Sequence, residues 1–322
     1  MVAYVWRLMR FGDNVLSAIF GPSKRVLLGG AGGGYDVFCA LPLYFALQQA
    51  GKEVVLANLS FSALSAAQGE RPHPACLRVT AETSHALDYF PEFHLSRWFK
   101  TAIGTDVAIY AFEQTGVAPL AEAYAAIIKT ESIDTVVLVD GGVDAVLRGD
   151  ESGLGTPSED LASLTAVASL SLERKFVVCT AFGVDAYHGV AHADFLTAVS
   201  TLTRRRAFFG TLSLLASMKE ADLFLSAVDF AHAASPAHTS IVCLSLLKAL
   251  QGGSGYEDVR EGASVWLNPI MPVHWFFDLR SVFERHLFAA SLAQTKSFPD
   301  LVEAIQAVRQ KMKIEERSAI PI

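Results

Sequence analysis

A glycine-rich loop between a short apolar run and a helical segment constrains this chain more than any other feature. Residues 26–28 (Val-Leu-Leu) predict a buried strand, and the loop follows them directly. Its glycines are Gly29, Gly30, Gly32, Gly33 and Gly34. Asp36 comes next, residues 37–50 carry apolar side chains at helical spacing, and residues 54–56 predict a second strand. Strand, loop, helix and strand in this order predict a βαβ unit with a parallel sheet.

The glycine loop is a candidate ligand-binding segment. Glycine permits positive φ and close approach of a ligand, and the start of a helix presents free N–H groups and the positive end of its dipole. We therefore expect Gly30, Gly32, Gly33 and Gly34 to contact a small polar ligand. The spacing fits neither the G-x-G-x-x-G fingerprint nor a P-loop. The alternative is that the loop is only a tight turn before a helix.

Asp36 limits what such a loop could bind. A carboxylate would repel a bare phosphate, but it suits a ribose hydroxyl, a cationic group or a bound Mg²⁺. Under the alternative, Asp36 is an exposed residue in the first turn of the helix.

Composition and charge narrow the class of protein. The chain has 322 residues, of which 52% are hydrophobic and 18% charged, which predicts a large core. The net charge is −7 and residues 204–206 (Arg-Arg-Arg) form the only basic run, so we do not expect nucleic acid as a partner. The four cysteines are far apart, without a C-x-x-C pair, which is typical of a reduced, cytoplasmic protein.

The chain is expected to have one domain, at residues 21–322, with helices at its C-terminal end. Residues 1–20 alternate apolar and basic side chains and predict an amphipathic helix that covers the domain or a partner chain. A homo-oligomer is one consequence of this interpretation, and a membrane-surface helix is its alternative. The apolar runs are too short to span a bilayer.

A second glycine and aspartate loop follows the strand predicted at residues 133–139. It reads Asp140-Gly141-Gly142-Val143-Asp144, and a long polar connection with Arg148 and Glu151 comes after it. Thr156 then predicts the N-cap of the next helix, with Pro157 in its first position and Glu159 as the capping-box partner.

A third such loop follows the strand predicted at residues 175–181. It holds Gly183 and Asp185, with His188 three residues further on. A parallel sheet places all its strand-to-helix loops along one edge, where open α/β sheets bind their ligands. Three loops in alternating β/α order therefore predict one shared site.

The remaining segments complete the predicted fold. We expect further strands at residues 76–80, 107–111, 223–228 and 265–267. We expect helices at residues 119–129, from about 192, at 207–220, 239–250, 279–292 and 297–312. Residues 90–99 are aromatic and predict no regular element, and Asn268 lies in a turn after a short strand. The fold class is α/β: a mostly parallel, Rossmann-like three-layer sheet with helices on both faces and a helical C-terminal cap.

Several of these segments together resemble a catalogued family. They are GGAGGGYDVFCALPL, DGGVDAVLRGDESGLGTPSEDLASL, FGVDAYHGVAHADFL, SPAHTSIVCLSLLKALQGGSGYED and LNPIMPVHWFFDL. In this order they resemble the family known as domain of unknown function 1152, from about residue 25 to 292, with the first 20 residues and the tail after Lys296 outside it. The resemblance supports the segmentation and the choice of loops, and it implies no reaction.

The acidic loops indicate a metal or a sugar ligand. Carboxylates that share a cleft raise one another's pKa unless a cation joins them, and Mg²⁺ or Mn²⁺ would suit them as cofactor. Without a metal they would suit ribose or other sugar hydroxyls. The candidate metal ligands are Asp140, Asp144 and Asp185, and the candidate catalytic residues are these three with His188. The candidate ligand-binding residues are Gly30, Gly32, Gly33, Gly34, Asp36, Gly141, Gly142, Arg148, Glu151 and Asn268. We interpret Asp150 and Asp160 as residues that cap helices or turns.

Three functions stay open at this point. The first is an enzyme that binds a nucleotide-like or sugar-bearing small molecule, with Mg²⁺ as a candidate cofactor, and acts by transfer or hydrolysis. The second is a metal-dependent amide or amidine hydrolase, although the Asp-Ala-His-x-Asp motif of binuclear-manganese enzymes is absent, since this chain has DGGVD. The third is a binding or sensor module that uses the same pocket without catalysis.

Overall fold

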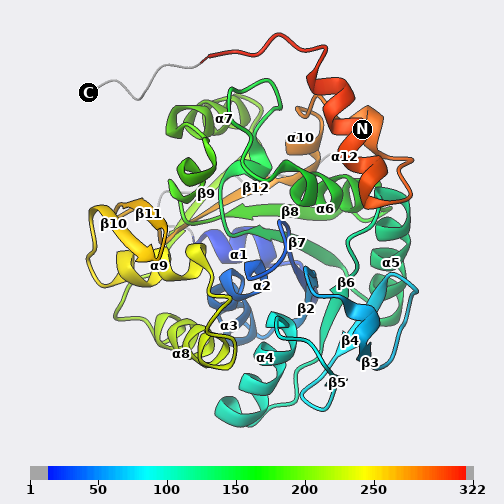
Figure 1. Ribbon diagram of the computed structural model, residues 1–322, viewed down its shortest axis with the longest axis vertical. Helices are drawn as coiled ribbons and strands as arrows, with labels where there is room; N and C mark the ends of the chain where they lie inside the picture. Colours follow the sequence, from blue (N-terminus) through cyan, green and yellow to red (C-terminus); the bar gives the residue numbers. More distant parts are fainter. Residues whose placement is uncertain (1–13, 317–322) are drawn as a thin grey trace.

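One eight-stranded sheet organises the molecule (Figure 1), and the computed structural model describes residues 14–316. In spatial order its strands are β4 (Cys76–Val79), β6 (Ile109–Phe112), β2 (Glu53–Leu59), β1 (Arg25–Gly30), β7 (Thr135–Asp140), β8 (Arg174–Cys179), β12 (Val273–Asp278) and β9 (Phe208–Ser213). The central strands β6, β2, β1, β7 and β8 are all parallel. The edges are antiparallel, because β4 pairs with β6 and β12 pairs with both β8 and β9.

The order of the parallel strands is that of a Rossmann-like sheet. From β1 the chain proceeds to β2 and β6 on one side and returns to β7 and β8 on the other. The direction of winding therefore reverses between β1 and β7, where Leu28 lies opposite Val137. Loops diverge at such a switch point and leave a crevice at the carboxyl ends of the strands, which is where open α/β sheets bind ligands.

Helices cover both faces of the sheet, as the sequence predicts. One face carries α1 (Val15–Phe20), α2 (Asp36–Cys39), α3 (Leu41–Gln49), α4 (Pro91–Trp98), α8 (Lys219–Ala234) and α9 (Ile241–Leu250). The other carries α5 (Val117–Thr130), α6 (Pro157–Ser169), α7 (His192–Arg204), α10 (Leu279–Phe283), α11 (Ala289–Leu292) and α12 (Phe298–Arg309). The period of two in β1 separates these cores, because Val26 and Leu28 face the first and Leu27 the second.

Short elements complete the chain. They are the 3₁₀ turns η1 (Leu64–Ala66), η3 (Asp144–Val146) and η4 (Val184–His188), the π-helical turn η2 (Phe99–Ile103), the hairpin β10 (Gly255–Arg260) with β11 (Ala263–Leu267), and the pair β3 (Ala67–Gln68) with β5 (Ser84–His85). In Figure 1 the hairpin lies beside α9 at the left of the sheet.

Two of the predicted elements have the wrong type: a strand lies where a helix is predicted, and a helix lies where a strand is predicted. Residues 208–213 of the helix predicted at residues 207–220 form strand β9, and the strand predicted at residues 223–228 lies inside helix α8. The buried residues of α8 include Ala221, Phe224 and Val228, a spacing of three to four that a short window does not reveal. The strand β9 is an edge strand whose aromatic and β-branched residues pair with β12.

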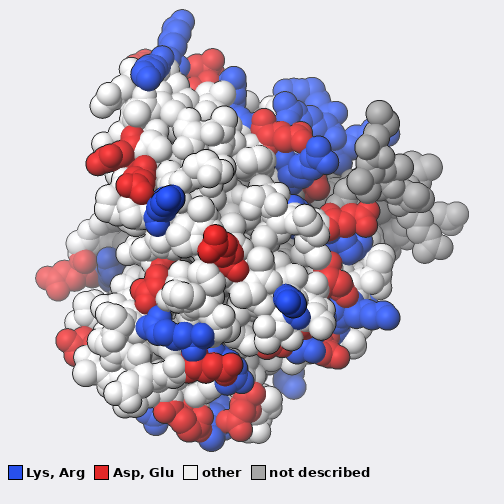
Figure 2. Space-filling view, turned by 90° about the vertical axis from the view of Figure 1, so that its right-hand side faces the viewer, with Lys and Arg blue, Asp and Glu red and all other residues white. Residues whose placement is uncertain are grey.

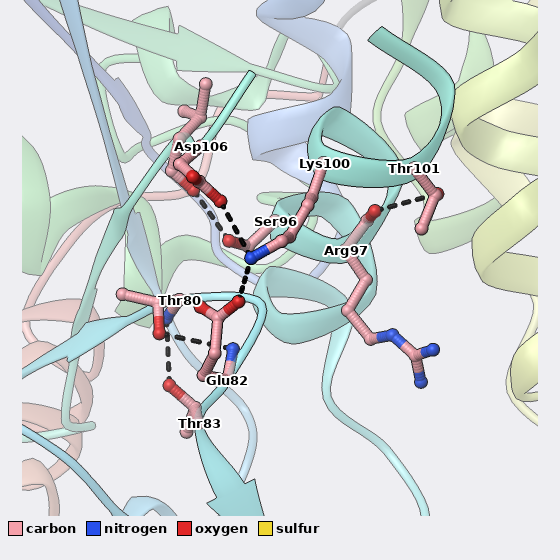
Figure 3. A network of polar contacts seen from close by, with 9 residues as sticks. Thr80, Glu82, Thr83, Ser96, Arg97, Lys100, Thr101 and Asp106 are labelled. Carbon is pink, nitrogen blue, oxygen red and sulfur yellow. Dashed lines mark hydrogen bonds and ion pairs between the residues drawn. The ribbon is translucent and has the colours of Figure 1, made fainter. Parts of the chain in front are cut away.

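The aromatic segment at residues 90–99 is also different from the prediction, because it forms α4. Pro91 starts this helix at a position that needs no N–H donor, and Leu95 and Trp98 are buried against the sheet. Figure 3 shows contacts of the turn η2, which directly follows α4. Lys100 Nζ contacts the carboxylates of Glu82 and Asp106. These exposed ion pairs contribute little stability each, and the buried aromatic side chains fix the helix.

The C-terminal helical region is divided. The helix predicted at residues 279–292 is two short helices, α10 and α11, and the helix predicted at 297–312 is α12, where Ser297 and Asp300 form a capping box. Of the amphipathic helix predicted at residues 1–20, the first 13 residues lie outside the described part of the chain, and the rest includes α1. No helix within residues 14–316 is long and apolar enough to cross a bilayer.

Charged side chains are mixed on the face drawn in Figure 2. Lys and Arg gather at one upper corner, and elsewhere on this face they alternate with Asp and Glu.

Candidate functional site

A cavity of about 370 Å³ lies at the switch point of the sheet. The three glycine and aspartate loops contribute to it, as the sequence predicts, and so do α6, the start of α9 and the end of β10. Its lining residues are Gly32, Gly33, Gly34, Tyr35, Asp36, Phe61, Tyr89, Asp140, Gly141, Asp144, Thr156, Asp160, Val184, Asp185, Tyr187, His188, His238, Thr239, Ser240, Ile241, Val242 and Arg260. This volume fits a sugar or a mononucleotide rather than a macromolecule.

Three buried carboxylates converge on one side of the cavity. One oxygen each of Asp36, Asp140 and Asp160 can be chosen so that all three lie within 4.8 Å of one another. Asp36 begins α2, Asp140 ends β7 and Asp160 lies in the first turns of α6. Three elements at the same edge of the sheet therefore place three acids around one point.

Asp160 is the residue that sequence reasoning misjudged. Its side chain is 2% exposed, and neither carboxylate oxygen has a hydrogen-bond partner among residues 14–316. The interpretation as a capping residue is therefore wrong. The signal was present in the sequence, because α6 follows the β7 loop and its first turns must lie at the same edge as that loop. Asp150 does have a structural partner, since its Oδ2 accepts a hydrogen bond from Arg148 Nη1 at 3.0 Å.

Backbone N–H groups orient the other carboxylates. Gly32 N donates to Asp36 Oδ2 at 2.6 Å, and Ala145 N donates to Asp140 Oδ2 at 3.1 Å. Val143 N donates to Asp185 Oδ2 at 2.6 Å. Each of these carboxylates therefore keeps unused acceptor capacity for a ligand or a cation.

The start of α6 differs from the prediction, because Thr156 contacts Asp144. Its Oδ2 accepts a hydrogen bond from Thr156 N at 2.7 Å. Thr156 is the N-cap of α6 and Pro157 its first residue, as predicted, but the Thr156 side chain makes no capping hydrogen bond. The predicted capping box with Glu159 is therefore wrong, because Thr156 faces Asp144 instead.

The glycines of the loops make room for these acids. A Cβ added at Gly32 would lie 3.1 Å from Asp36 Oδ2 and 3.1 Å from Asp160 Oδ1. A Cβ at Gly141 would lie 2.6 Å from Asp36 Oδ1, and one at Gly142 would lie 2.7 Å from both oxygens of Asp185. The backbone thus runs closer to the carboxylates than any residue with a side chain would allow.

Burial raises the pKa of every carboxyl in this cluster. It raises the pKa of Asp36 to about 7, although the Gly32 N–H partly offsets this. The pKa values of Asp140 and Asp160 are raised well above the ordinary range by burial, with a smaller contribution from the charge of Asp144. Burial likewise raises the pKa of Asp185 and Asp144. A cation among them would favour the ionised forms.

Several predicted site residues lie outside the cavity wall. Glu151 accepts hydrogen bonds from the N–H groups of Arg148 and Gly149 and so closes its own loop. Arg148 pairs with Asp150, and Asn268 donates to Phe182 O at 2.9 Å while its Oδ1 accepts from Ile270 N. Gly30 and Gly142 are also absent from the lining. Each leaves space for a neighbouring side chain instead: a Cβ at Gly30 would lie 2.1 Å from Asn58 Oδ1.

The remaining predicted residues do line the cavity, together with others that the sequence did not reveal. His188 is an exposed residue at the rim, and its charge when protonated lowers the pKa of Asp144. Tyr35, Arg260 and His238 also line the cavity. The last two reach it from β10 and from the loop before α9, which no motif marks.

The fold and this cavity define a Rossmann-like α/β protein with an acidic crevice at the carboxyl ends of its parallel strands. A model of the family described as "Protein of unknown function (DUF1152)" matches residues 95–317, which is most of the chain, and the chain therefore belongs to this family. No curated protein and no solved structure gave a match.

The matched region confirms the resemblance seen in the sequence but has different limits. It begins at residue 95, so the glycine loop and α2 lie before it, and it continues through α12. The expectation that the tail after Lys296 lies outside the family is wrong. The match includes Asp140, Asp144, Asp160 and Asp185, whereas Asp36 precedes it.

Proposed function

We propose that the protein is an enzyme that binds a small polar molecule in the switch-point cavity together with one Mg²⁺ or Mn²⁺ ion. The candidate cation ligands are Asp36, Asp140 and Asp160, and the reaction is a hydrolysis or a group transfer. This ligand set replaces two members of the set predicted from the sequence, because Asp144 and Asp185 are not in the group whose oxygens converge.

The observation that carries the proposal is the carboxylate of Asp160. It is buried, it has no hydrogen-bond partner in the described part of the chain, and it lies beside two further buried acids. A buried carboxylate without a partner is costly, so a protein that keeps one there needs a compensating group. Oxygen-rich sites with several carboxylates are typical of Mg²⁺ and Mn²⁺.

The arrangement of the other residues supports a reaction beside the cation. Held here, a divalent ion would supply a Lewis acid at one side of the cavity. Asp144 and Asp185 lie along the same wall, with one oxygen of each fixed by the backbone. His188 stands at the rim as a candidate acid or base, since an imidazole can accept a proton at one ring nitrogen and donate one from the other.

Turnover with and without metal tests the proposal. Purified protein is incubated with a panel of sugar and nucleotide esters and of amides, in EDTA or with Mg²⁺ or Mn²⁺. We expect turnover that requires the metal and is lost in Asp140→Asn, while Asp258→Asn, at an exposed position in the β10–β11 hairpin, serves as the matched control.

The outcomes separate the three functions. Turnover of esters supports the proposal, and turnover of amides or amidines with two bound ions per chain indicates the metal-dependent hydrolase instead. Binding of metal and of a ligand without turnover indicates a sensor module. Turnover in EDTA that survives Asp140→Asn would contradict the proposal.

A further inference from the structure

One wall of the cavity comes from outside the three glycine and aspartate loops and has a different chemistry. It is built by the start of α9, by the loop before it and by Arg260 at the end of β10, and Figure 1 shows α9 beside this hairpin. Thr239, Ser240, Ile241 and Val242 all line the cavity. The hairpin and the helix are also packed against η4, which carries Asp185.

The N-terminus of α9 presents unused backbone donors to this cavity. The first intrahelical hydrogen bond runs from Leu244 N to Ser240 O, and the Ser240 side chain accepts from Cys243 N. The N–H groups of Ile241 and Val242 precede both bonds, so neither has an intrahelical acceptor. Together with the helix dipole they favour an anionic group.

Arg260 adds a full positive charge at the same place. Its Nη1 donates to Thr239 O, which fixes the guanidinium at the entrance to α9. Within residues 14–316 no carboxylate lies in ion-pair contact with Arg260, although it lines a cavity that contains five aspartates. His238 lies at the rim with its ring against Tyr89 and adds a second donor.

The buried hydroxyl of Tyr35, near the start of α9, also lacks a partner among residues 14–316. Tyr35 lines the cavity, its side chain is 7% exposed, and its hydroxyl forms no hydrogen bond with the described residues. Its ring packs edge-on against His232, whose Nε2 accepts from Ser240 N. Burial raises the pKa of Tyr35, so the hydroxyl keeps its proton and can act as a donor. An unsatisfied buried donor at a polar cavity indicates a missing acceptor.

We propose that this wall, formed by Tyr35, the N–H groups of Ile241 and Val242, and Arg260, binds the phosphate group of the small molecule. The inference rests on the proposed function, because the acidic wall would repel a phosphate that arrived without a cation. The cavity therefore selects a phosphate ester bound together with the divalent ion, with the donors binding the phosphate and the carboxylates binding the ion. The sugar or base would then face Phe61 and Tyr187, which are exposed aromatic residues of the lining.

Ligand titrations with matched probes test this inference. Isothermal titration in Mg²⁺ compares ribose 5-phosphate, glycerol 3-phosphate and adenosine monophosphate with ribose, glycerol and adenosine. We expect at least one phosphate ester to bind about tenfold or more tightly than its parent alcohol. Arg260→Gln should weaken that ester by about tenfold and leave the affinity for Mn²⁺ unchanged. Arg280→Gln, which changes an arginine paired with Glu284 outside the cavity, is the control.

The two proposals fail in distinguishable ways. If none of the esters binds more tightly than its parent, or if Arg260→Gln leaves ester binding unchanged, the phosphate subsite is overturned even where Mn²⁺ still binds. If ribonate binds as tightly as ribose 5-phosphate, the wall recognises carboxylates and the phosphate assignment is also overturned. Ester binding in EDTA that is insensitive to Asp160→Asn would contradict the cation site and leave the anion wall in place.

Discussion

Gly155 lies so close to Asp144 that a Cβ added at Gly155 would be 2.0 Å from Asp144 Oδ2. Gly155 also has a φ of +65°, which residues other than glycine rarely adopt. It stands just before Thr156, whose N–H donates to the same oxygen. The backbone at the start of α6 therefore packs directly against the carboxylate of Asp144.

Replacing this glycine should distort the cavity as well as the fold. Gly155→Ala and Gly51→Ala both place alanine at positive φ, but the space around Gly51 is open. Each substitution should cost about 1 kcal/mol of unfolding free energy from backbone strain. Gly155→Ala should cost about 2 kcal/mol more, because Asp144 must move. Denaturant unfolding measures both. Equal losses of unfolding free energy in the two variants would show that Asp144 moves aside without an energetic cost.

Removing the unpartnered carboxylate should stabilise the metal-free protein. In EDTA at pH 8, Asp160→Asn replaces a buried carboxyl, whose pKa burial raises well above the ordinary range, by a neutral amide of similar shape. We expect the free energy of unfolding to rise by about 1–3 kcal/mol, measured by urea titration. Asp258→Asn, at an exposed position, should change it little.

The same variant should bind metal poorly. Loss of one of three carboxylates should weaken Mn²⁺ by at least about tenfold, which electron paramagnetic resonance of free Mn²⁺ can follow. A variant that is less stable in EDTA and binds Mn²⁺ normally would mean that Asp160 has a structural role alone.

A divalent ion should protect the native state against heat. At about a hundred times its Kd, Mn²⁺ should add about 2.7 kcal/mol to the unfolding free energy. The protection should disappear in EDTA and in the double variant Asp140→Asn, Asp160→Asn. Differential scanning fluorimetry measures the midpoint. An equal increase in wild type and double variant would place the ion elsewhere on the chain.

The buried acid of α4 should make stability depend on pH. Glu92 is 0% exposed, it accepts a hydrogen bond from Asn58 Nδ2 at 2.8 Å, and burial raises its pKa to about 7. The native state thus keeps this proton up to about pH 7, whereas the unfolded chain releases it near 4.5. Its contribution to stability is therefore intact below about pH 4.5 and decreases as the pH rises to 7.

Glu92→Gln should remove this dependence. We expect wild type and variant to be equally stable at pH 5, and the variant to be more stable at pH 8 by up to about 3 kcal/mol. Glu303→Gln, at an exposed position on α12, is the control. A constant difference between wild type and Glu92→Gln from pH 5 to 8 would show that the carboxyl titrates normally. Asn58 also donates to Gly34 O, so this pair reaches the glycine loop of the cavity.

The sequence predicted the edge of the sheet where the cavity lies, because strand, glycine and aspartate recur there in one order. Asp36, Asp140, Asp144 and Asp185 all reach the cavity from these loops. The sequence did not predict which three carboxylates converge. That depends on how far α6 extends over β7, and this distance is set by tertiary packing. Asp160 was therefore assigned to a cap although it completes the cluster.

The part of the lining that holds Arg260 could not be predicted for a different reason. Arg260 is the last residue of β10, a strand with alternating exposed residues and no motif. It reaches the cavity only because β10 and β11 pack against α9 and η4. The exchange of helix and strand at residues 207–228 shows the same limit. Short apolar windows fit both periods, and pairing with β12 decides that residues 208–213 are a strand.

Crystals grown with Mn²⁺ and measured near the manganese absorption edge would test the central claim most directly. We predict one anomalous peak per chain, about 2.0–2.2 Å from oxygens of Asp36, Asp140 and Asp160. A peak held by Asp144 and Asp185 without Asp160, or no peak at a concentration of Mn²⁺ that protects the protein against heat, would contradict the account.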